Sequence, residues 1–279
     1  MKTIIKGSLA ILFVAALFTA CNKDNNITPA EATINEAAIT SSEDVSDAES
    51  YSQNTEDESD MAIEGMGSGG PGGSNCAVVT YSAPRGTFPQ TITVDFGTGC
   101  TDHNGRVRKG KMVIALSDSL MKPNATKIVT FQNFYVDSAK IEGTRSWKNN
   151  GLNAQGQPSF TRTVTNGKIT FGDGTIATWN ATHTVVKTQG FNTRTPLDDV
   201  WTVTGTESGV NRKGKAFSSV INSPIVHKAL CPWITIGVRT ITIEGNARSL
   251  DYGYGGGDCD RDALLTLPNG QTKVIKLRR

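Results

Sequence analysis

Alternation of apolar and polar residues is the pattern that most constrains what this chain can fold into. It is clearest in Thr91–Phe96 and in Thr235–Ile243, where every second residue is apolar except for a one-residue slip at Arg239–Thr240. A period of two marks a strand with one buried face, and a β-bulge inserts a single extra residue of this kind. The sequence therefore predicts strands, and we find no segment with a convincing helical period.

Turn signals between these runs predict how the strands are connected. Asn-Gly pairs stand at Asn104, Asn166 and Asn269, and glycine also marks Gly172–Gly174 and Gly245–Asn246. Asn-Gly between alternating runs is the strongest short signal for a hairpin, and we expect one at Asn166–Gly167. Consecutive hairpins give an all-β fold, an antiparallel meander that forms a β-sandwich or a strongly curved open sheet. Residues 76–279 are long enough for one such domain.

The first 21 residues predict export. Lys2 and Lys6 precede a largely apolar run that ends at Phe18, and small residues then lead to Cys21. A charged start, a short apolar run and a small-residue cleavage site are typical of a secretory signal. The cysteine makes it resemble a bacterial lipoprotein signal, which implies removal of residues 1–20 and lipidation of Cys21. The alternative is an ordinary signal peptide, with Cys21 in a disulfide.

Residues 22–75 differ in composition from the rest of the chain. They contain 12 acidic residues and one basic residue, Lys23, and they end in the glycine-rich stretch Gly65–Ser74. Such a segment has too little apolar surface to offset the entropy lost on ordering. With the lipidated cysteine, residues 21–75 are therefore expected to form a disordered acidic linker that tethers the domain to the membrane.

The remaining chain is strongly basic. Residues 76–279 hold 25 basic and 14 acidic residues, so their formal charge is +11 within a whole-chain charge of +2. This asymmetry suggests an anionic polysaccharide, lipid phosphate, or the acidic tether folding back on the domain; the alternative is a solvated face with no partner. Nucleic acid is not expected, because the chain is exported and has no nucleic-acid module. The candidate anion-binding residues lie in two similar segments: Arg106, Arg108, Lys109, Arg212 and Lys213.

Four further cysteines predict a disulfide framework, because exported domains with an even number of cysteines usually oxidise them in pairs. Cys76 and Cys100 are symmetric about a turn-rich stretch near residue 88, and Cys231 and Cys259 are symmetric about Gly245. If each pair faces across a hairpin, the pairing is Cys76–Cys100 with Cys231–Cys259.

The sequence carries no motif that predicts catalysis, a cofactor or a metal. It lacks the closely spaced Cys and His residues of a zinc site, a Gly-x-Ser-x-Gly elbow and a recognisable cysteine-nucleophile signature. Acidic residues that could form a glycosidase pair are present, as in any β protein of this size. We therefore favour a non-enzymatic protein, and a secreted hydrolase remains a weaker alternative.

Several stretches resemble a group of uncharacterised secreted lipoproteins of the Bacteroidota. They are Thr91–Cys100, Gly105–Lys111, Asn166–Thr175 with Trp179, Asp199–Gly205, Cys231–Thr235, and Leu250–Gly253 with Cys259. The segment Asn22–Asn26 is also similar to the short charged signals that follow the lipid cysteine in surface lipoproteins of these bacteria. The resemblance implies an all-β fold and an outer-membrane, lipid-anchored location at the cell surface, and it carries over no functional site.

These observations lead to one main functional expectation. A lipid on Cys21 would attach the protein to the membrane, and the basic β domain would bind a glycan or another anionic surface component. A structural or assembly lipoprotein that docks on an outer-membrane complex is the first alternative. Lipid carriage, like hydrolysis, is a weaker alternative function. A polar, salt-sensitive groove would favour the first reading, and an exposed apolar patch or open sheet edge would favour the second.

Overall fold

The computed structural model of the chain describes residues 29–64, 77–101, 105–193 and 195–277. They form one long helix, α1 (Pro29–Glu64), a short 3-10 helix, η2 (Pro196–Asp198), and a sheet of 14 strands. The strands are β1 (Val78–Tyr81), β2 (Gln90–Asp95), β3 (Cys100–Thr101), β4 (Val107–Leu116), β5 (Thr126–Val136), β6 (Ala139–Leu152), β7 (Pro158–Thr170), β8 (Ile176–Gln189), β9 (Val200–Val210), β10 (Ala216–Lys228), β11 (Ile236–Ile243), β12 (Asn246–Asp251), β13 (Asp262–Thr266) and β14 (Thr272–Lys276).

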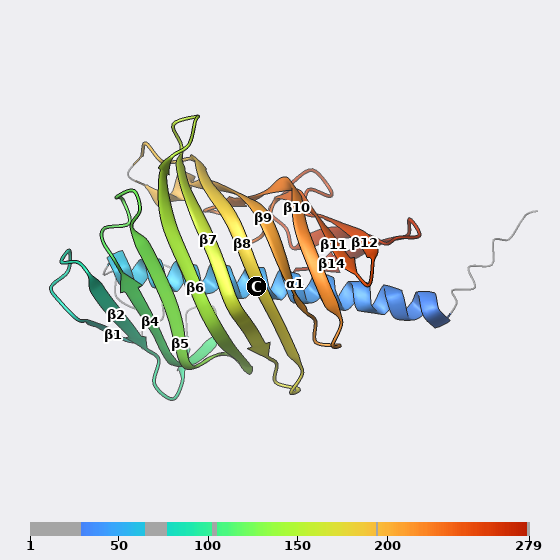
Figure 1. The fold of residues 1–279 in the computed structure, drawn as a ribbon, viewed down its shortest axis with the longest axis horizontal. Helices are drawn as coiled ribbons and strands as arrows, with labels where there is room; N and C mark the ends of the chain where they lie inside the picture. Colours follow the sequence, from blue (N-terminus) through green and yellow to red (C-terminus); the bar gives the residue numbers. More distant parts are fainter. Residues whose placement is uncertain (1–28, 65–76, 102–104, 194, 278–279) are drawn as a thin grey trace, which may run out of the picture.

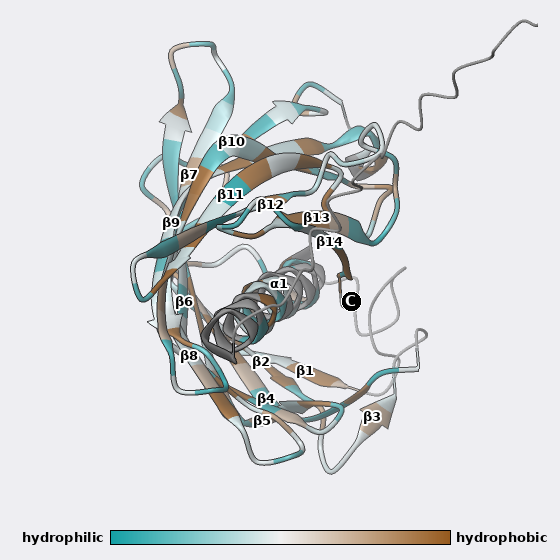
Figure 2. Cartoon of the chain, turned by 90° about the vertical axis from the view of Figure 1, so that its right-hand side faces the viewer, coloured by the Kyte–Doolittle hydropathy of each residue, from teal (hydrophilic) through white to brown (hydrophobic). Residues whose placement is uncertain are grey.

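The sheet is an antiparallel meander. Its strands follow chain order from β1 to β14, apart from β3, which pairs with β4 beside β2. Figure 1 shows the long central strands β6 to β10 side by side, and Figure 2 shows the sheet curving around α1. The predicted all-β meander is therefore confirmed. Of its two predicted forms, the structure has the strongly curved open sheet and not the β-sandwich.

Bulges account for much of this curvature, and one of them stands where we expected a turn. Asn166 has a φ of 52° inside the continuous strand β7, and the β7–β8 register shifts between Val164 and Gly167. The predicted hairpin at Asn166–Gly167 is thus wrong, because asparagine and glycine accept the positive φ of a bulge as readily as that of a turn. On the neighbouring strand, a Cβ at Gly143 would lie 2.7 Å from the Asn166 carbonyl oxygen, so only glycine fits there.

The acidic segment differs most from its prediction. Residues 29–64 form α1, so the expectation of a disordered tether over residues 21–75 does not hold for them; Cys21 and residues 65–75 lie outside the described part of the chain. The prediction of disorder from composition holds for a segment on its own. Here the sheet buries part of the segment and places positive charge beside its carboxylates. Pro29 is the first helical residue, a position that proline favours. Among the described residues, no helix is both long and apolar enough to span a membrane.

The interior between the sheet and α1 is only partly apolar. Aliphatic side chains fill it near β2 and β4, where Ile92 and Ile114 are fully buried, and near β11 to β13, where Ile241 and Leu265 are fully buried. The inner face of the central strands instead mixes valines with buried charged side chains. α1 makes ion pairs with Lys127 on this face and with Arg212 and Lys213 in the turn between β9 and β10.

Candidate functional site

A set of buried cations lines the concave face of the sheet, and we call this surface the basic groove. It is formed by one inward side chain from each of five strands, all no more than 7% exposed: Lys127 on β5, Arg145 on β6, Arg162 on β7, Arg239 on β11 and Arg248 on β12. Arg108 on β4, one of the residues predicted from the sequence, is buried to the same degree, at 4% exposed. Lysine and arginine are almost never buried to this degree unless a counter-charge or acceptor meets them. The groove is therefore built to face negative charge.

The helix α1 supplies that negative charge to Lys127, which pairs with Glu56 and Asp60. Arg239 instead pairs with Glu207 of the sheet. The 36 residues of α1 include 11 acidic and no basic residues. The formal charge of −11 on α1 balances the +11 on residues 76–279. Of the anionic partners that the sequence suggested, the structure contains the acidic segment itself. α1 lies within the concave face of the sheet and crosses its strands (Figures 1 and 2).

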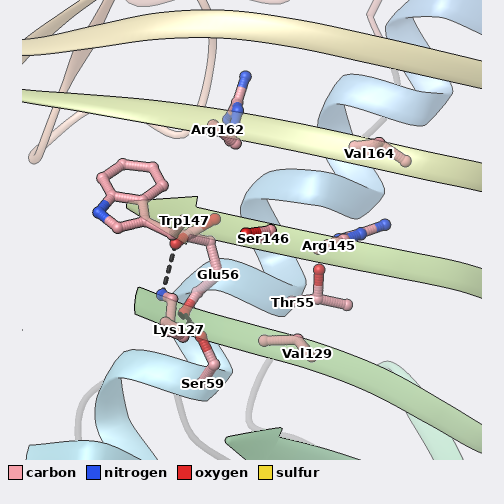
Figure 3. Close-up of a pocket in the computed structure, with 10 residues that line it drawn as sticks. All are labelled: Thr55, Glu56, Ser59, Lys127, Val129, Arg145, Ser146, Trp147, Arg162 and Val164. Carbon is pink, nitrogen blue, oxygen red and sulfur yellow. Dashed lines mark hydrogen bonds and ion pairs between the residues drawn. The ribbon is translucent and has the colours of Figure 1, made fainter. Parts of the chain in front are cut away.

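Lys127 is the centre of the contact near the carboxyl end of α1 (Figure 3). Its Nζ atom lies 2.5 Å from Glu56 Oε1 and 2.7 Å from Asp60 Oδ1, and it donates to Ser59 Oγ at 3.1 Å. Burial acts to lower the pKa of Lys127, but the carboxylates of Asp60 and Glu56 outweigh it and raise that pKa above its ordinary value. The cavity left beside these groups is about 10 Å³, room for about one water molecule.

A second contact holds the amino-terminal half of α1 to the turn between β9 and β10. Arg212 donates to Asp44 twice, from Nε to Oδ1 at 2.5 Å and from its backbone nitrogen to Oδ2 at 2.8 Å. Asn211 Nδ2 donates to Ser41 Oγ at 2.7 Å, and Lys213 forms an ion pair with Glu36. Burial raises the pKa of Asp44 in spite of the opposing hydrogen bonds and charge of Arg212.

Backbone acceptors on α1 add to the polar contact, one between these two sets of ion pairs and one nearer the carboxyl end of the helix. Arg145 Nη1 donates to the Tyr51 carbonyl oxygen at 2.9 Å, and Tyr81 Oη on β1 donates to the Ala62 carbonyl oxygen at 2.8 Å. Many buried positions of α1 lie three or four residues apart, and residues 40–42 and 44–46 are buried throughout, so the sheet covers more than one face of the helix there. The buried side chains are mostly small or polar, which lets the helix backbone lie close to the sheet: Ser41, Val45, Ala48, Thr55, Ser59 and Ala62.

A buried network braces the floor of the groove. Arg239 Nη1 lies 2.5 Å from Glu207 Oε1, which lies 3.5 Å from His183 Nε2. The other ring nitrogen, His183 Nδ1, lies 3.0 Å from Arg162 Nη2. All four residues are at most 6% exposed with α1 in place, and the network fixes the positions of Arg162 and Arg239 in the groove.

An aromatic cluster adjoins the cations. The ring of Trp147 lies 5.0 Å from Phe160 and 6.3 Å from Trp201, and all three residues are half-buried. Lys127 lies 5.5 Å from the Trp147 ring, and Lys187 lies 5.4 Å from the Trp201 ring. Flat rings beside ammonium groups can stack on a sugar while the cations bind its acidic substituents.

The structure separates the predicted anion-binding residues. Arg212 and Lys213 contact α1 in the β9–β10 turn. Arg108 and Lys109 lie on β4 and Arg106 directly precedes it, with strands β5 to β8 between them and that turn. Lys109 Nζ lies 4.3 Å from the ring of Tyr135. The five residues therefore do not form one site.

The sequence analysis missed Lys127, Arg145, Arg162 and Arg239, although strand phase carried a signal. Arg162 stands two residues from Phe160 and from Val164, which places a cation in the apolar phase of its strand. Arg239 is likewise two residues from Ile241. A cation at a strand position in step with the apolar residues predicts a buried counter-charge. The net charge used for our prediction does not show which face of the sheet a basic residue lies on.

The cysteines agree with the predicted pairing as far as the structure describes them. Cys231 and Cys259 form a disulfide with a Cα–Cα distance of 5.6 Å, beyond the β11–β12 hairpin that turns at Gly245. Cys100 is also disulfide-bonded. Its predicted partner, Cys76, lies outside the described residues, as does Cys21.

No group of three or more His, Cys, Asp or Glu side chains within the described ranges is arranged to hold a metal ion. The chain was also compared with protein-family models, curated proteins and solved structures, and it matches none of the three.

Proposed function

We propose that this protein is an outer-membrane lipoprotein, anchored through lipid on Cys21 and exposed at the cell surface, whose β domain binds an anionic glycan without catalysis. The observation that carries the proposal is the polar contact that holds the acidic helix α1, through Lys127 and Arg145 in the groove and through Arg212 and Lys213 in the β9–β10 turn, beside an aromatic cluster. Carboxylate or sulfate groups along a polysaccharide present the same chemistry as the carboxylates of α1. The disulfide Cys231–Cys259 supports an extracytoplasmic location.

In this proposal α1 occupies the ligand site and is exchanged for the glycan. The contacts that hold α1 are largely ionic or polar, and each can be replaced by an acidic group of the ligand. The aliphatic part of the helix interface is small, with Val45, Ala48 and Ala62 as its most buried side chains. Because the groove must open first, the apparent affinity is the intrinsic affinity reduced by the fraction of molecules with α1 displaced.

The second candidate is a structural lipoprotein that docks on an outer-membrane complex, and the open edge at β14 favours it. Lipid carriage fits less well, because the concave face carries buried cations in its middle. Hydrolysis has less support, since Glu207 and His183 are buried and already engaged with arginines.

The test is a calorimetric titration of the full mature chain with polygalacturonate, and with neutral dextran for comparison, at low salt and at about 0.3 M salt. The informative variant is the helix-neutral variant, which we define as Glu36→Gln, Asp44→Asn, Glu56→Gln and Asp60→Asn together. It weakens α1 as a competitor and leaves the groove intact, so we expect tighter polygalacturonate binding than in the wild type. Asp118→Asn is the control, since Asp118 is a partly exposed carboxylate that pairs with Lys122 of the sheet domain.

Adding Lys127→Met to the helix-neutral variant should reverse the gain, because it removes a groove cation that the ligand needs. Binding of dextran should stay absent throughout, and binding of polygalacturonate should weaken with salt. If the helix-neutral variant binds polygalacturonate no better than the wild type, or not at all, the groove is not the site of an anionic ligand and the proposal is wrong.

A further inference from the structure

Within the described ranges of the chain, no strand pairs with the outer side of the last strand of the sheet. β14 pairs with β13 and ends the sheet. Leu267 N donates to the Gln271 oxygen at 2.8 Å and Leu277 N donates to the Arg261 oxygen at 2.7 Å. Antiparallel pairing alternates along a strand, so Lys273 and Ile275 direct their backbone groups toward β13.

The backbone groups of the intervening residues therefore point away from the sheet. These are Thr272, Val274 and Lys276, whose side chains are exposed as well. Their N–H and C=O groups form a row on which a further antiparallel strand can pair, as occurs when an extended peptide adds to a sheet edge.

A cavity of about 590 Å³ lies beside this edge. α1 contributes Ile39 and Glu43 to its wall, and the indole of Trp233 and the side chain of Arg261 also line it, with residues 273–277 along β14. Trp233 is half-buried and Val274 is 38% exposed, which offers apolar contact to a ligand. Lys276 pairs with Asp262 of β13, and Arg261 and Lys273 still outnumber Glu43, so the charge of the lining is net positive.

We infer that the free edge of β14 and this cavity form a docking site for an extended, acidic segment of a partner protein, which adds to the sheet as a further strand. Backbone hydrogen bonds to Thr272, Val274 and Lys276 would supply the pairing, and Trp233 would pack against apolar side chains of the segment. The positive lining selects acidic residues in it.

The same charges make a second copy of this chain the wrong occupant. Antiparallel pairing of two β14 strands would bring lysines of both copies to one edge, and like charges across a strand pair destabilise it. The site also leaves α1 in place, because α1 forms part of the cavity wall. The inference is therefore independent of the glycan proposal, which requires α1 to leave the groove.

Fluorescence anisotropy with a labelled peptide of alternating glutamate and valine tests the site on the full chain. We expect saturable binding of this peptide and at least a tenfold weaker binding of the same peptide with lysine in place of glutamate. Val274→Pro should weaken binding about tenfold, which corresponds to about 1.4 kcal/mol, because it removes an outward N–H that the peptide needs. Proline is tolerated at an edge when its nitrogen faces away from the ladder, so the β13–β14 pairing should persist.

Val274→Thr is the matched control, since it keeps the N–H and the β-branched side chain, and it should bind as the wild type does. Lys273→Glu gives a second readout that does not depend on a folded proline variant, and it should reduce binding of the glutamate peptide and improve binding of the lysine peptide. Equal binding by Val274→Pro and Val274→Thr, no preference between the two peptides, or no binding of the glutamate peptide would each overturn the inference. So would a concentration-dependent dimer that Val274→Pro dissociates.

Discussion

At the scale of single residues, Lys127 shows how strongly α1 depends on ionic contact. Its side chain is 3% exposed and faces both Glu56 and Asp60. Removing one partner of a buried pair typically costs about 3–5 kcal/mol, because the remaining charge stays desolvated. Asp60 is 50% exposed, so water can solvate it when Lys127 is removed. For Lys127→Met we therefore expect the free energy of unfolding, measured by urea unfolding followed by circular dichroism, to fall by about 3 kcal/mol, the lower end of this range.

Lys122→Met is the control for this substitution. Lys122 pairs with Asp118, four residues earlier in the connection between β4 and β5, and their side chains are 64% and 38% exposed. An exposed pair of this kind contributes about 0–1 kcal/mol, so its loss should be near the error of the measurement. Adding Glu56→Gln and Asp60→Asn to Lys127→Met should recover part of the loss. Equal effects of the two lysine substitutions would contradict our view of the α1 contact.

Asp44 makes a prediction about pH. Because burial raises its pKa in the folded protein, Asp44 binds a proton more readily in the folded than in the unfolded state. The contribution of Asp44 to the free energy of unfolding is therefore greatest at low pH. It is lost as the pH rises from the ordinary pKa of the unfolded state, about 4, to the raised pKa of the folded state. The free energy of unfolding of the wild type minus that of Asp44→Asn should fall between about pH 3 and about pH 7.

Asp118→Asn should give the opposite slope in the same experiment. The hydrogen bond from Lys122 lowers the pKa of Asp118, so its contribution is present above its ordinary pKa and is lost as the pH falls through the lowered one. The wild type minus Asp118→Asn difference should thus rise with pH over the acidic range. A rising difference for Asp44 as well would mean that Arg212 outweighs burial at that carboxylate.

At the scale of elements, the strands could be predicted from sequence and the helix could not. A period of two is local information: it predicted strands at Thr91–Phe96, where β2 spans Gln90–Asp95, and at Thr235–Ile243, where β11 spans Ile236–Ile243. The helix has no apolar stripe, because its buried face consists of residues such as Ser41, Thr55 and Ser59. Its stability depends on a partner far along the chain: Lys127 is 71 residues from Glu56. The basic groove was missed for the same reason, since burial of a cation depends on what covers it.

The helix should therefore be stable only on the sheet. Acidic residues stand four apart at Glu43 and Asp47, at Glu56 and Asp60, and at Asp60 and Glu64, and such like-charge pairs destabilise an isolated helix. A synthetic peptide of residues 29–64 should show little helical circular dichroism at neutral pH.

In the full chain, a protease site placed within Gly65–Ser74 would allow α1 to be cut from the folded domain. We expect the cut segment to co-elute with the domain in size-exclusion chromatography at low salt and to separate at about 1 M salt, where the Debye length is about 3 Å. The segment from the helix-neutral variant should separate already at low salt. A wild-type segment that stays bound at high salt would show that Val45 and its apolar neighbours, and not the ion pairs, hold the helix.

At the scale of the whole molecule, two oppositely charged parts of one chain neutralise each other. The charge of −11 on α1 faces a sheet domain of +11. Like charges repel one another within each part, and the opposite net charges attract the two parts to each other. This attraction extends beyond the pairs that touch: Lys213 and Glu36 are 41% and 68% exposed, and their interaction is open to screening. Stability of the full chain should then depend on ionic strength more than that of a protein held by an apolar core.

Thermal melting measures this dependence. Raising sodium chloride from about 0.05 M to about 0.5 M should lower the Tm of the wild type by about 5 °C, which corresponds to a loss of about 2 kcal/mol for a domain of this size. The helix-neutral variant should start from a lower Tm and change little with salt, because four of the charges that salt would screen are gone. The difference between the two proteins isolates the contact of α1 with the sheet, since both share every other salt-dependent contribution. If the two Tm values shift in parallel, long-range attraction does not hold the helix in the groove, and a polyanion would have no electrostatic advantage over α1 for the same site.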